Sequence, residues 1–192
     1  MSITAPMSLR IVLMDLYLLM ITAYNYVLMR RGHMNIFYLD HDVKLCASWH
    51  FDKHVIKMIL ESCQLLCAAH HMLDNNPSEE LYKMTHANHP SAIWVRQSVH
   101  NYMWLWELTL ALNEEYKRRY KKTSDHLSIV KLRHILSIAP DLIPDVPFFE
   151  PPQCMPEEFR TDDAEQAYRF YYCEGKKHLA VWTDTETPYW FT

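Results

Sequence analysis

The run from Ser91 to about Lys122 constrains the fold of this chain more than any other part of the sequence. Its pattern is helical, and its first half carries large apolar side chains on every side of that helix. A helix that is apolar all round has to be buried, so the rest of the chain must cover it. We therefore predict an all-α fold, a compact single-domain helical bundle around a buried central helix at about 91–121. The apolar residues that carry this prediction are Trp94, Val95, Val99, Tyr102, Met103, Trp104, Leu105, Trp106, Leu108 and Leu112.

The remaining segments read as shorter helices and extended connections. A short apolar lead-in at 35–39, extended or a lone strand, precedes helices bounded by Asp, Ser and Pro residues. Six prolines between 140 and 156 predict an extended excursion, and an aromatic tail at 182–191 should pack back on the body. We expect a helix over 42–49 and a main helix that restarts near Asp52 and ends at about Leu73, followed by a helical turn or two at 78–84. A further helix should span 125–138, with a cap at Ser124 or Asp125. The last helix should be capped by Asp162 or Asp163, and Gly175 could interrupt it.

Residues 1–33 stand apart from the rest. The mostly apolar run from Ile11 to Met29 is bracketed by arginines, as in a membrane anchor, but Asp15 within it would be costly in a bilayer. Arg30 and Arg31 can also be read from a purine-rich ribosome-binding sequence two codons before Met34. We expect residues 1–33 to be a misplaced start, with an apolar anchor as the alternative, and 34–192 to be one helical domain.

Composition excludes several classes of function. Gly32 and Gly175 are the only glycines, so neither a Walker loop nor a dinucleotide-binding fingerprint exists. The five cysteines have no metal-binding spacing and are expected to be free thiols. The net charge is −4, and it becomes −6 without residues 1–33, which hold three arginines and one aspartate. This net negative charge disfavours nonspecific binding to nucleic acid.

A helix over 50–61 would present an unusual stripe of ionisable side chains. His50, Lys53, His54, Lys57 and Glu61 recur at spacings of three and four and share one face. His54 and Glu61 could act as acid–base groups, with Lys57 or Lys53 as an amine nucleophile or phosphate clamp. The alternative is an ordinary solvated face with a Lys57–Glu61 ion pair.

The polar segment 85–90 just before the central helix, which we call the polar knot, is a second candidate site. Together with buried ionisable groups on that helix, it could share one pocket with the first stripe, because buried charges need partners. His50 and His54, with His86 and His89, could also ligate a divalent metal; we predict no cofactor and keep a metal-dependent hydrolase as an alternative. The residues expected to contact substrate are His86, Asn88, His89, Arg96, Asn101 and Trp94, and His100 and Glu107 share the polar stripe of Arg96.

Several of these motifs together resemble a family of small bacteriophage proteins, over essentially all of 34–192. The resemblance implies the cytoplasm of an infected bacterium and, with a start at Met34, no stable association with a membrane. It rests on Asp52-Lys53-His54-Val55-Ile56-Lys57-Met58 with Glu61, on Thr85-His86-Ala87-Asn88-His89-Pro90, Trp94, Asn101 and Trp104, and on Tyr168-Arg169 and Pro188-Tyr189-Trp190-Phe191.

The chain is also more distantly similar to the phage pyrimidine-dimer DNA glycosylase, endonuclease V. The similarity lies in the order of helices and in Met155-Pro156-Glu157-Glu158-Phe159-Arg160 before an aromatic tail. That enzyme uses the α-amine of an N-terminal threonine, whereas here Asn35 follows Met34, and methionine is not readily removed before asparagine. We read Lys53 and His54 where its catalytic glutamate would fall.

The resemblance implies an enzyme acting on an N-glycosidic bond in DNA or a nucleotide, with a glycosylase/lyase as the nearest example. The alternative from another class is a noncatalytic phage factor that binds a nucleotide or a protein. The sequence indicates no oligomeric state.

Overall fold

A computed structural model describes residues 34–192, so the expectations for residues 1–33 lie outside the described part of the chain. Residues 35–192 form one compact unit. No strand occurs in the described part, which confirms the all-α prediction. The elements are α2 (Val43–Trp49), α3 (Asp52–Leu73), α4 (Pro90–Arg96), α5 (Val99–Arg119), α6 (Leu127–Leu136), η1 (Glu157–Phe159), α7 (Ala164–Cys173) and η2 (Lys177–Leu179).

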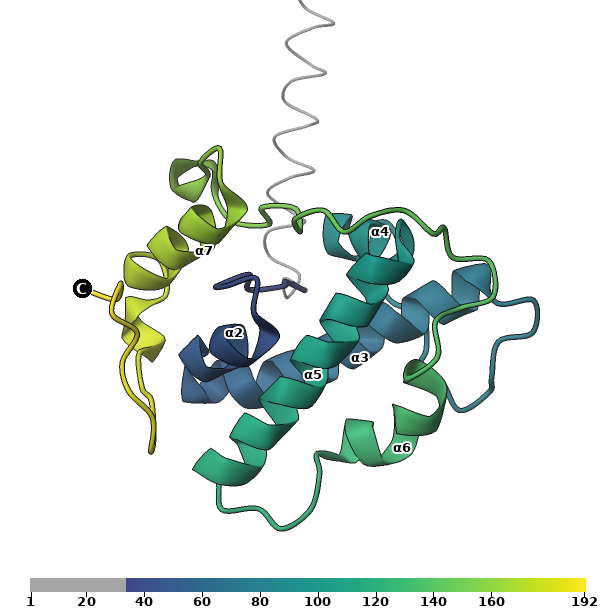
Figure 1. Cartoon of the computed structure of the whole chain (residues 1–192), viewed down its shortest axis with the longest axis horizontal. Coiled ribbons are helices and arrows are strands. Elements are labelled where there is room, and N and C mark those ends of the chain that lie inside the picture. The colour runs from purple at the N-terminus through teal and green to yellow at the C-terminus, as the bar shows by residue number, and fades with distance from the viewer. Residues whose placement is uncertain (1–33) are drawn as a thin grey trace, which may run out of the picture. The chain divides into compact units, whose positions relative to one another are not determined.

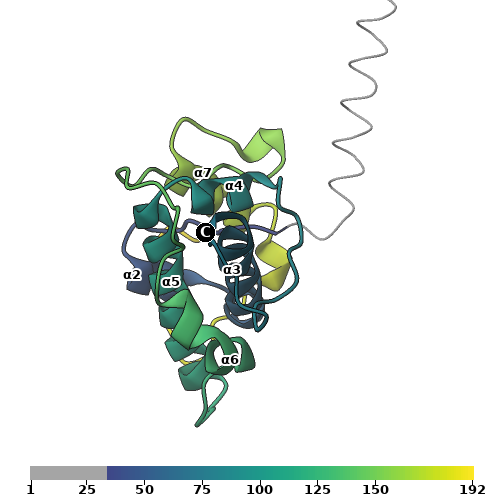
Figure 2. The ribbon, with the colours of Figure 1, turned by 90° about the vertical axis from the view of Figure 1, so that its right-hand side faces the viewer.

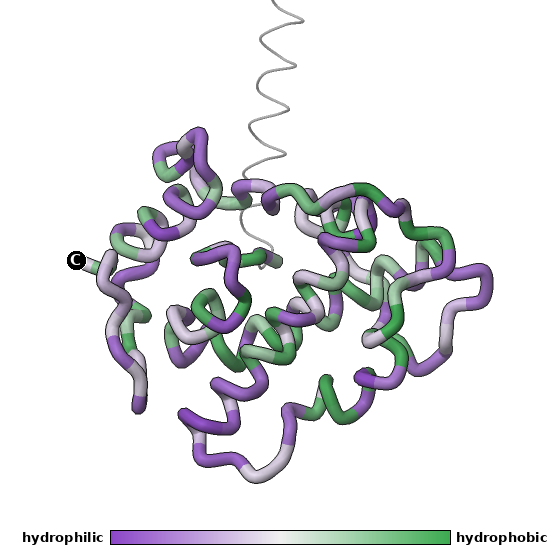
Figure 3. Tube along the Cα trace, in the orientation of Figure 1, coloured by the Kyte–Doolittle hydropathy of each residue, from purple (hydrophilic) through white to green (hydrophobic). Residues whose placement is uncertain are grey.

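Helix α5 is the centre of the packing, as predicted. It packs mainly against α3 and α2, and it also contacts α4 and α6 (Figure 1). The view at right angles places α6 at one end of α5 and α4 toward the other (Figure 2). Tyr102, Leu105 and Leu112 of α5 are fully buried. Its last turns are hydrophilic, with basic residues where the helix dipole favours them (Figure 3).

The prediction of one continuous helix over 91–121 is wrong, because the chain breaks between α4 and α5 at Gln97 and Ser98. Ser98 has an extended backbone and caps α5 by accepting a hydrogen bond from the His100 amide at 3.1 Å. Its hydroxyl donates to the Val146 carbonyl. Asn101 in turn donates to the Trp94 carbonyl at 3.0 Å, which satisfies the end of α4. Polar side chains therefore replace the helical hydrogen bonds that the break removes.

The helices before α4 agree with the prediction except at one segment. Asp42 caps α2 through the amides of Lys44 and Leu45, and α3 ends at Leu73. Of the helical turns expected at 78–84, the structure has one turn at 79–80, closed by the Leu81 amide donating to the Ser78 carbonyl at 3.3 Å, and no helix. The Leu81 side chain is buried against the body.

The cap of α6 is His126 rather than Ser124 or Asp125. The His126 ring accepts a hydrogen bond from the Ser128 amide at 3.2 Å. Asp125 is instead bound by Asn113 of α5 and Arg133 of α6, each at 2.8 Å. Its carboxylate therefore joins two helices and does not start one.

The proline-rich segment and the aromatic tail run as predicted. Residues 140–156 are extended, and the Trp94 indole of α4 donates to the Phe149 carbonyl at 2.8 Å. Asp163 caps α7, which ends before Gly175; a Cβ at Gly175 would overlap the Tyr171 ring. The tail packs Trp182 and Phe191 against Phe51.

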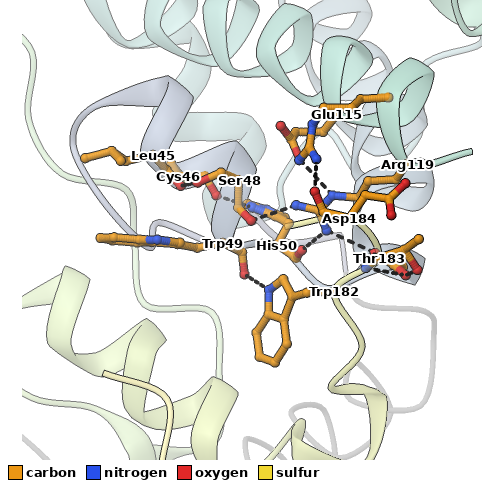
Figure 4. Close-up of polar contacts among 12 residues, drawn as sticks. Leu45, Cys46, Ser48, Trp49, His50, Glu115, Arg119, Trp182, Thr183 and Asp184 are labelled. Atoms are coloured by element: carbon orange, nitrogen blue, oxygen red, sulfur yellow. Dashed lines mark hydrogen bonds and ion pairs between the residues drawn. The ribbon is translucent and has the colours of Figure 1, made fainter. Parts of the chain in front are cut away.

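A buried arginine joins the ends of several elements (Figure 4). The Arg119 side chain has no exposed surface and donates to the carbonyls of Ser48 and His50 and to the carboxylates of Asp52 and Glu115, at 2.6 to 3.1 Å. Asp52 also accepts from the backbone and hydroxyl of Thr183 in the tail. We call this set the Arg119 clasp, because it fixes α2, α3, α5 and the tail to one another.

Candidate functional site

The stripe predicted over 50–61 is divided between core and surface. His50 ends α2, and α3 begins only at Asp52, so His50 does not share a helix face with the others. His50 and His54 are buried, whereas Lys53 and Lys57 are exposed. Glu61 lies between the two environments, with a side chain that is 13% exposed.

The two histidines are held inside an aromatic cluster. His50 Nδ1 donates to the Cys46 carbonyl at 2.7 Å, and His54 Nδ1 lies 2.7 Å from the Tyr172 hydroxyl. The His54 ring also stacks on Phe37, with 4.4 Å between centroids. Burial lowers the pKa of His50 to about 4 and that of His54 to about 2. Both rings are therefore neutral near pH 7.

Glu61 combines the features expected of a reactive carboxylate. Its Oε1 lies 3.0 Å from Lys57 Nζ, and its Oε2 accepts a hydrogen bond from the Asn35 backbone nitrogen at 3.4 Å. Burial raises the pKa of Glu61 above its ordinary value, against the opposing effect of Lys57, the Asn35 amide and His86. A carboxyl group with a raised pKa beside an amine is suited to proton exchange with that amine.

The contact with Asn35 was not predicted, because no helical periodicity connects residues 26 positions apart. Sequence comparison placed Lys53 and His54 where endonuclease V has its catalytic glutamate. The structure instead brings Glu61, two turns further along α3, to the first residues of the described domain. A carboxylate does therefore lie beside the backbone nitrogen of residue 35.

The polar knot before α4 reaches the same site through His86. His86 lies close enough to Glu61 to favour its ionised form. Its backbone has a φ of 54°, and its carbonyl accepts from the His89 amide at 2.8 Å. His89 caps α4, and Arg96 donates to the Ala87 carbonyl at 2.5 Å. Arg96 thus braces the loop that presents His86 and the exposed Asn88.

Asn101 and Trp94, the other predicted substrate contacts, have different surroundings. Asn101 is fully buried and binds the backbone of Trp94 and Phe149. His100 and Glu107 are exposed, so the buried polar stripe expected on the central helix is absent. Trp94 is nearly buried but lines an open, mostly apolar groove of about 290 Å³ between α4 and residues 149–152.

The four histidines considered as metal ligands are not gathered. Among residues 34–192, no group of three or more His, Cys, Asp or Glu side chains is arranged to hold a metal ion. His50 and His54 are buried in the aromatic cluster, whereas His86 and His89 belong to the loop before α4. All five cysteines are free thiols.

Cations gather on the outer side of α3, although the chain as a whole is acidic. Lys57, Lys176 and His178 all lie close enough to His54 to lower its pKa further. Lys53 adds a charge one turn before Lys57 on α3. Lys176 and His178 were not singled out in the sequence, because their proximity depends on how α7 and η2 fold back on α3.

Comparison with known proteins adds no assignment. Searches against protein-family models, curated proteins and solved structures find no match. Within the described residues, no helix combines the length and apolar character needed to cross a bilayer. The functional argument therefore rests on the geometry around Glu61.

Proposed function

We propose that this protein is an enzyme that cleaves an N-glycosidic bond in DNA or a nucleotide, with Glu61 as its acid–base group and Lys57 as its amine. The observation that carries the proposal is the half-buried Glu61 carboxylate, 3.0 Å from Lys57 Nζ and 3.4 Å from the Asn35 nitrogen. The resemblance to a phage DNA glycosylase favours the same reaction class.

The proposed chemistry uses each group in a defined role. The unprotonated amine attacks the anomeric carbon of the sugar, and the base leaves with the electron pair of the N-glycosidic bond. The sugar ring then opens to give an imine between the amine nitrogen and that carbon. Glu61 accepts the proton that the amine loses and returns it later, a role suited to a carboxyl group with a raised pKa.

Lys57 is the amine of choice, because its amine is in contact with Glu61.

The surroundings supply groups that could contact a substrate. His86 and Asn88 lie in the exposed loop beside Glu61, and Lys53 and Lys176 offer positive charge to phosphates. The local concentration of cations supports binding at this face even though the net charge is −4.

Borohydride trapping on a duplex containing a pyrimidine dimer or an abasic site tests the proposal. We expect the full chain to form a covalent adduct, because borohydride reduces the imine to a stable amine. Lys57→Ala should abolish the adduct, because it removes the nitrogen that carries the sugar. Glu61→Gln should reduce the trapping rate by about 100-fold, the usual contribution of an acid–base group.

Lys131→Ala is the matched control, since Lys131 is an exposed lysine of α6 that takes no part in the proposed site. Its trapping rate should equal that of the unmodified protein. A protein that binds these substrates without forming any adduct would reject the amine mechanism and leave the noncatalytic binding factor as the better account.

A further inference from the structure

The Asn35 carboxamide is a buried junction beside Glu61. Its side chain donates to the Cys154 carbonyl at 3.1 Å, and its Oδ1 accepts from the Ile36 amide at 2.9 Å. The residue is only 3% exposed. These bonds fix residue 35 from its side chain, so its backbone nitrogen has a defined direction, toward Glu61 Oε2.

Tyr168 completes the junction from α7. Its hydroxyl lies 2.8 Å from Asn35 Oδ1 and 2.8 Å from the Pro152 carbonyl, and it accepts from the Cys154 amide at 3.2 Å. Its single proton is therefore shared between two acceptors. The ring is fully buried. Three segments distant in sequence, namely the lead-in, the proline-rich segment and α7, thus meet at one hydroxyl and one carboxamide.

We propose that Asn35 and Tyr168 are positioning residues for the Glu61 site: they hold the nitrogen of residue 35 against the Glu61 carboxylate. This inference deepens the proposed function and rests on it for its catalytic meaning. The junction holds residues 35–39 in place against the body, and it thereby orients Oε2 of Glu61. The other oxygen is held by Lys57.

The test measures the titration of the Glu61 carboxyl group by NMR in the full chain, alongside the trapping rate. Tyr168→Phe keeps the ring and removes only the hydroxyl. We expect the lead-in to loosen and the Asn35 amide to leave Glu61, so the pKa of Glu61 rises and the trapping rate falls by about tenfold, as expected for misplacing a catalytic group. Asn35→Ala removes the other half of the junction and should act in the same direction.

Tyr102→Phe is the matched control. Tyr102 is equally buried, and its hydroxyl binds His70 and the Leu136 carbonyl. Its removal should leave the Glu61 titration unchanged, so a shift seen only at Tyr168 and Asn35 separates positioning from general loss of stability. Unchanged Glu61 titration in folded Tyr168→Phe and Asn35→Ala proteins would overturn the inference. A shifted titration in a protein that forms no adduct would support the positioning and reject the proposed reaction.

Discussion

Burial shifts the pKa of several titratable side chains in this protein, among them His50, His54 and Glu61. Lys57 and Glu61 were predicted as a pair from their spacing, and the pair is present at 3.0 Å. The spacing did not indicate that Glu61 is largely buried or that Asn35 binds it. Nor did it separate His50 and His54, which face the core, from the lysines. A helical pattern of charges gives the face of a helix, but the environment of that face depends on segments that arrive from elsewhere in the chain.

The buried histidines predict a stability that falls in mild acid. The pKa of His50 is lowered to about 4 by burial, so the unfolded chain binds more protons than the folded one between about pH 6.5 and 4. The free energy of unfolding should therefore decrease as pH falls through this window, by about 1.4 kcal/mol per pH unit for each such histidine.

Urea unfolding of the full chain at pH 7, 5.5 and 4.5 measures this slope. His50→Leu should reduce the slope by about 1.4 kcal/mol per pH unit, because one of the two buried rings is gone while His54 remains. Ser124→Ala, which removes no titrating group from an exposed position, should leave the slope unchanged. Equal slopes in all three proteins would contradict the assignment to His50.

Helix caps explain which helix ends could be predicted from the sequence and which could not. Asp42 and Asp163 were expected as caps, and both accept hydrogen bonds from helix amides. The break between α4 and α5 at Ser98 was missed, because apolar side chains continue on both sides of it. The apolar pattern over 91–121 therefore gives no sign that the helix is interrupted. The 78–84 segment forms one turn and no helix, and contacts with distant residues hold it: Leu81 is buried, and Tyr82 binds His71 and Ser128.

Replacement of Ser98 tests whether its cap maintains the break. Ser98→Ala removes the acceptor for the His100 amide and the donor to Val146 in a buried position. We expect a loss of about 1–2 kcal/mol in the free energy of unfolding. Ser124→Ala is the control, because the exposed Ser124 does not cap α6; it should change stability by less than about 0.5 kcal/mol. Similar effects at the two serines would contradict this role of Ser98.

Across the whole molecule, the all-α class and the burial of the central helix follow from the apolar pattern. The packing order and the Arg119 clasp do not, because they depend on contacts between distant residues. The sequence does not distinguish Arg119 from its neighbour Arg118, because both lie in the basic last turn of the same helix. In the structure the two differ completely: the Arg118 side chain is 41% exposed, whereas that of Arg119 has no exposed surface.

The clasp predicts a large difference between these neighbouring arginines. Arg119→Met leaves Asp52 and Glu115 without their buried partner, which should cost about 3–5 kcal/mol of stability. Arg118→Met removes an exposed ion pair and should cost less than about 1 kcal/mol. Thermal unfolding of both proteins decides the matter, and comparable losses would show that Arg119 does not hold the elements together.

The central claim is that Glu61 and its neighbouring amine form the reactive site. The most direct measurement is peptide mapping by mass spectrometry of the borohydride-reduced adduct on the full chain, which identifies the nitrogen that carries the sugar. The account predicts the adduct on Lys57, whose amine lies 3.0 Å from Glu61. An adduct on a lysine away from Glu61, or an equal yield with Glu61→Gln, would contradict it.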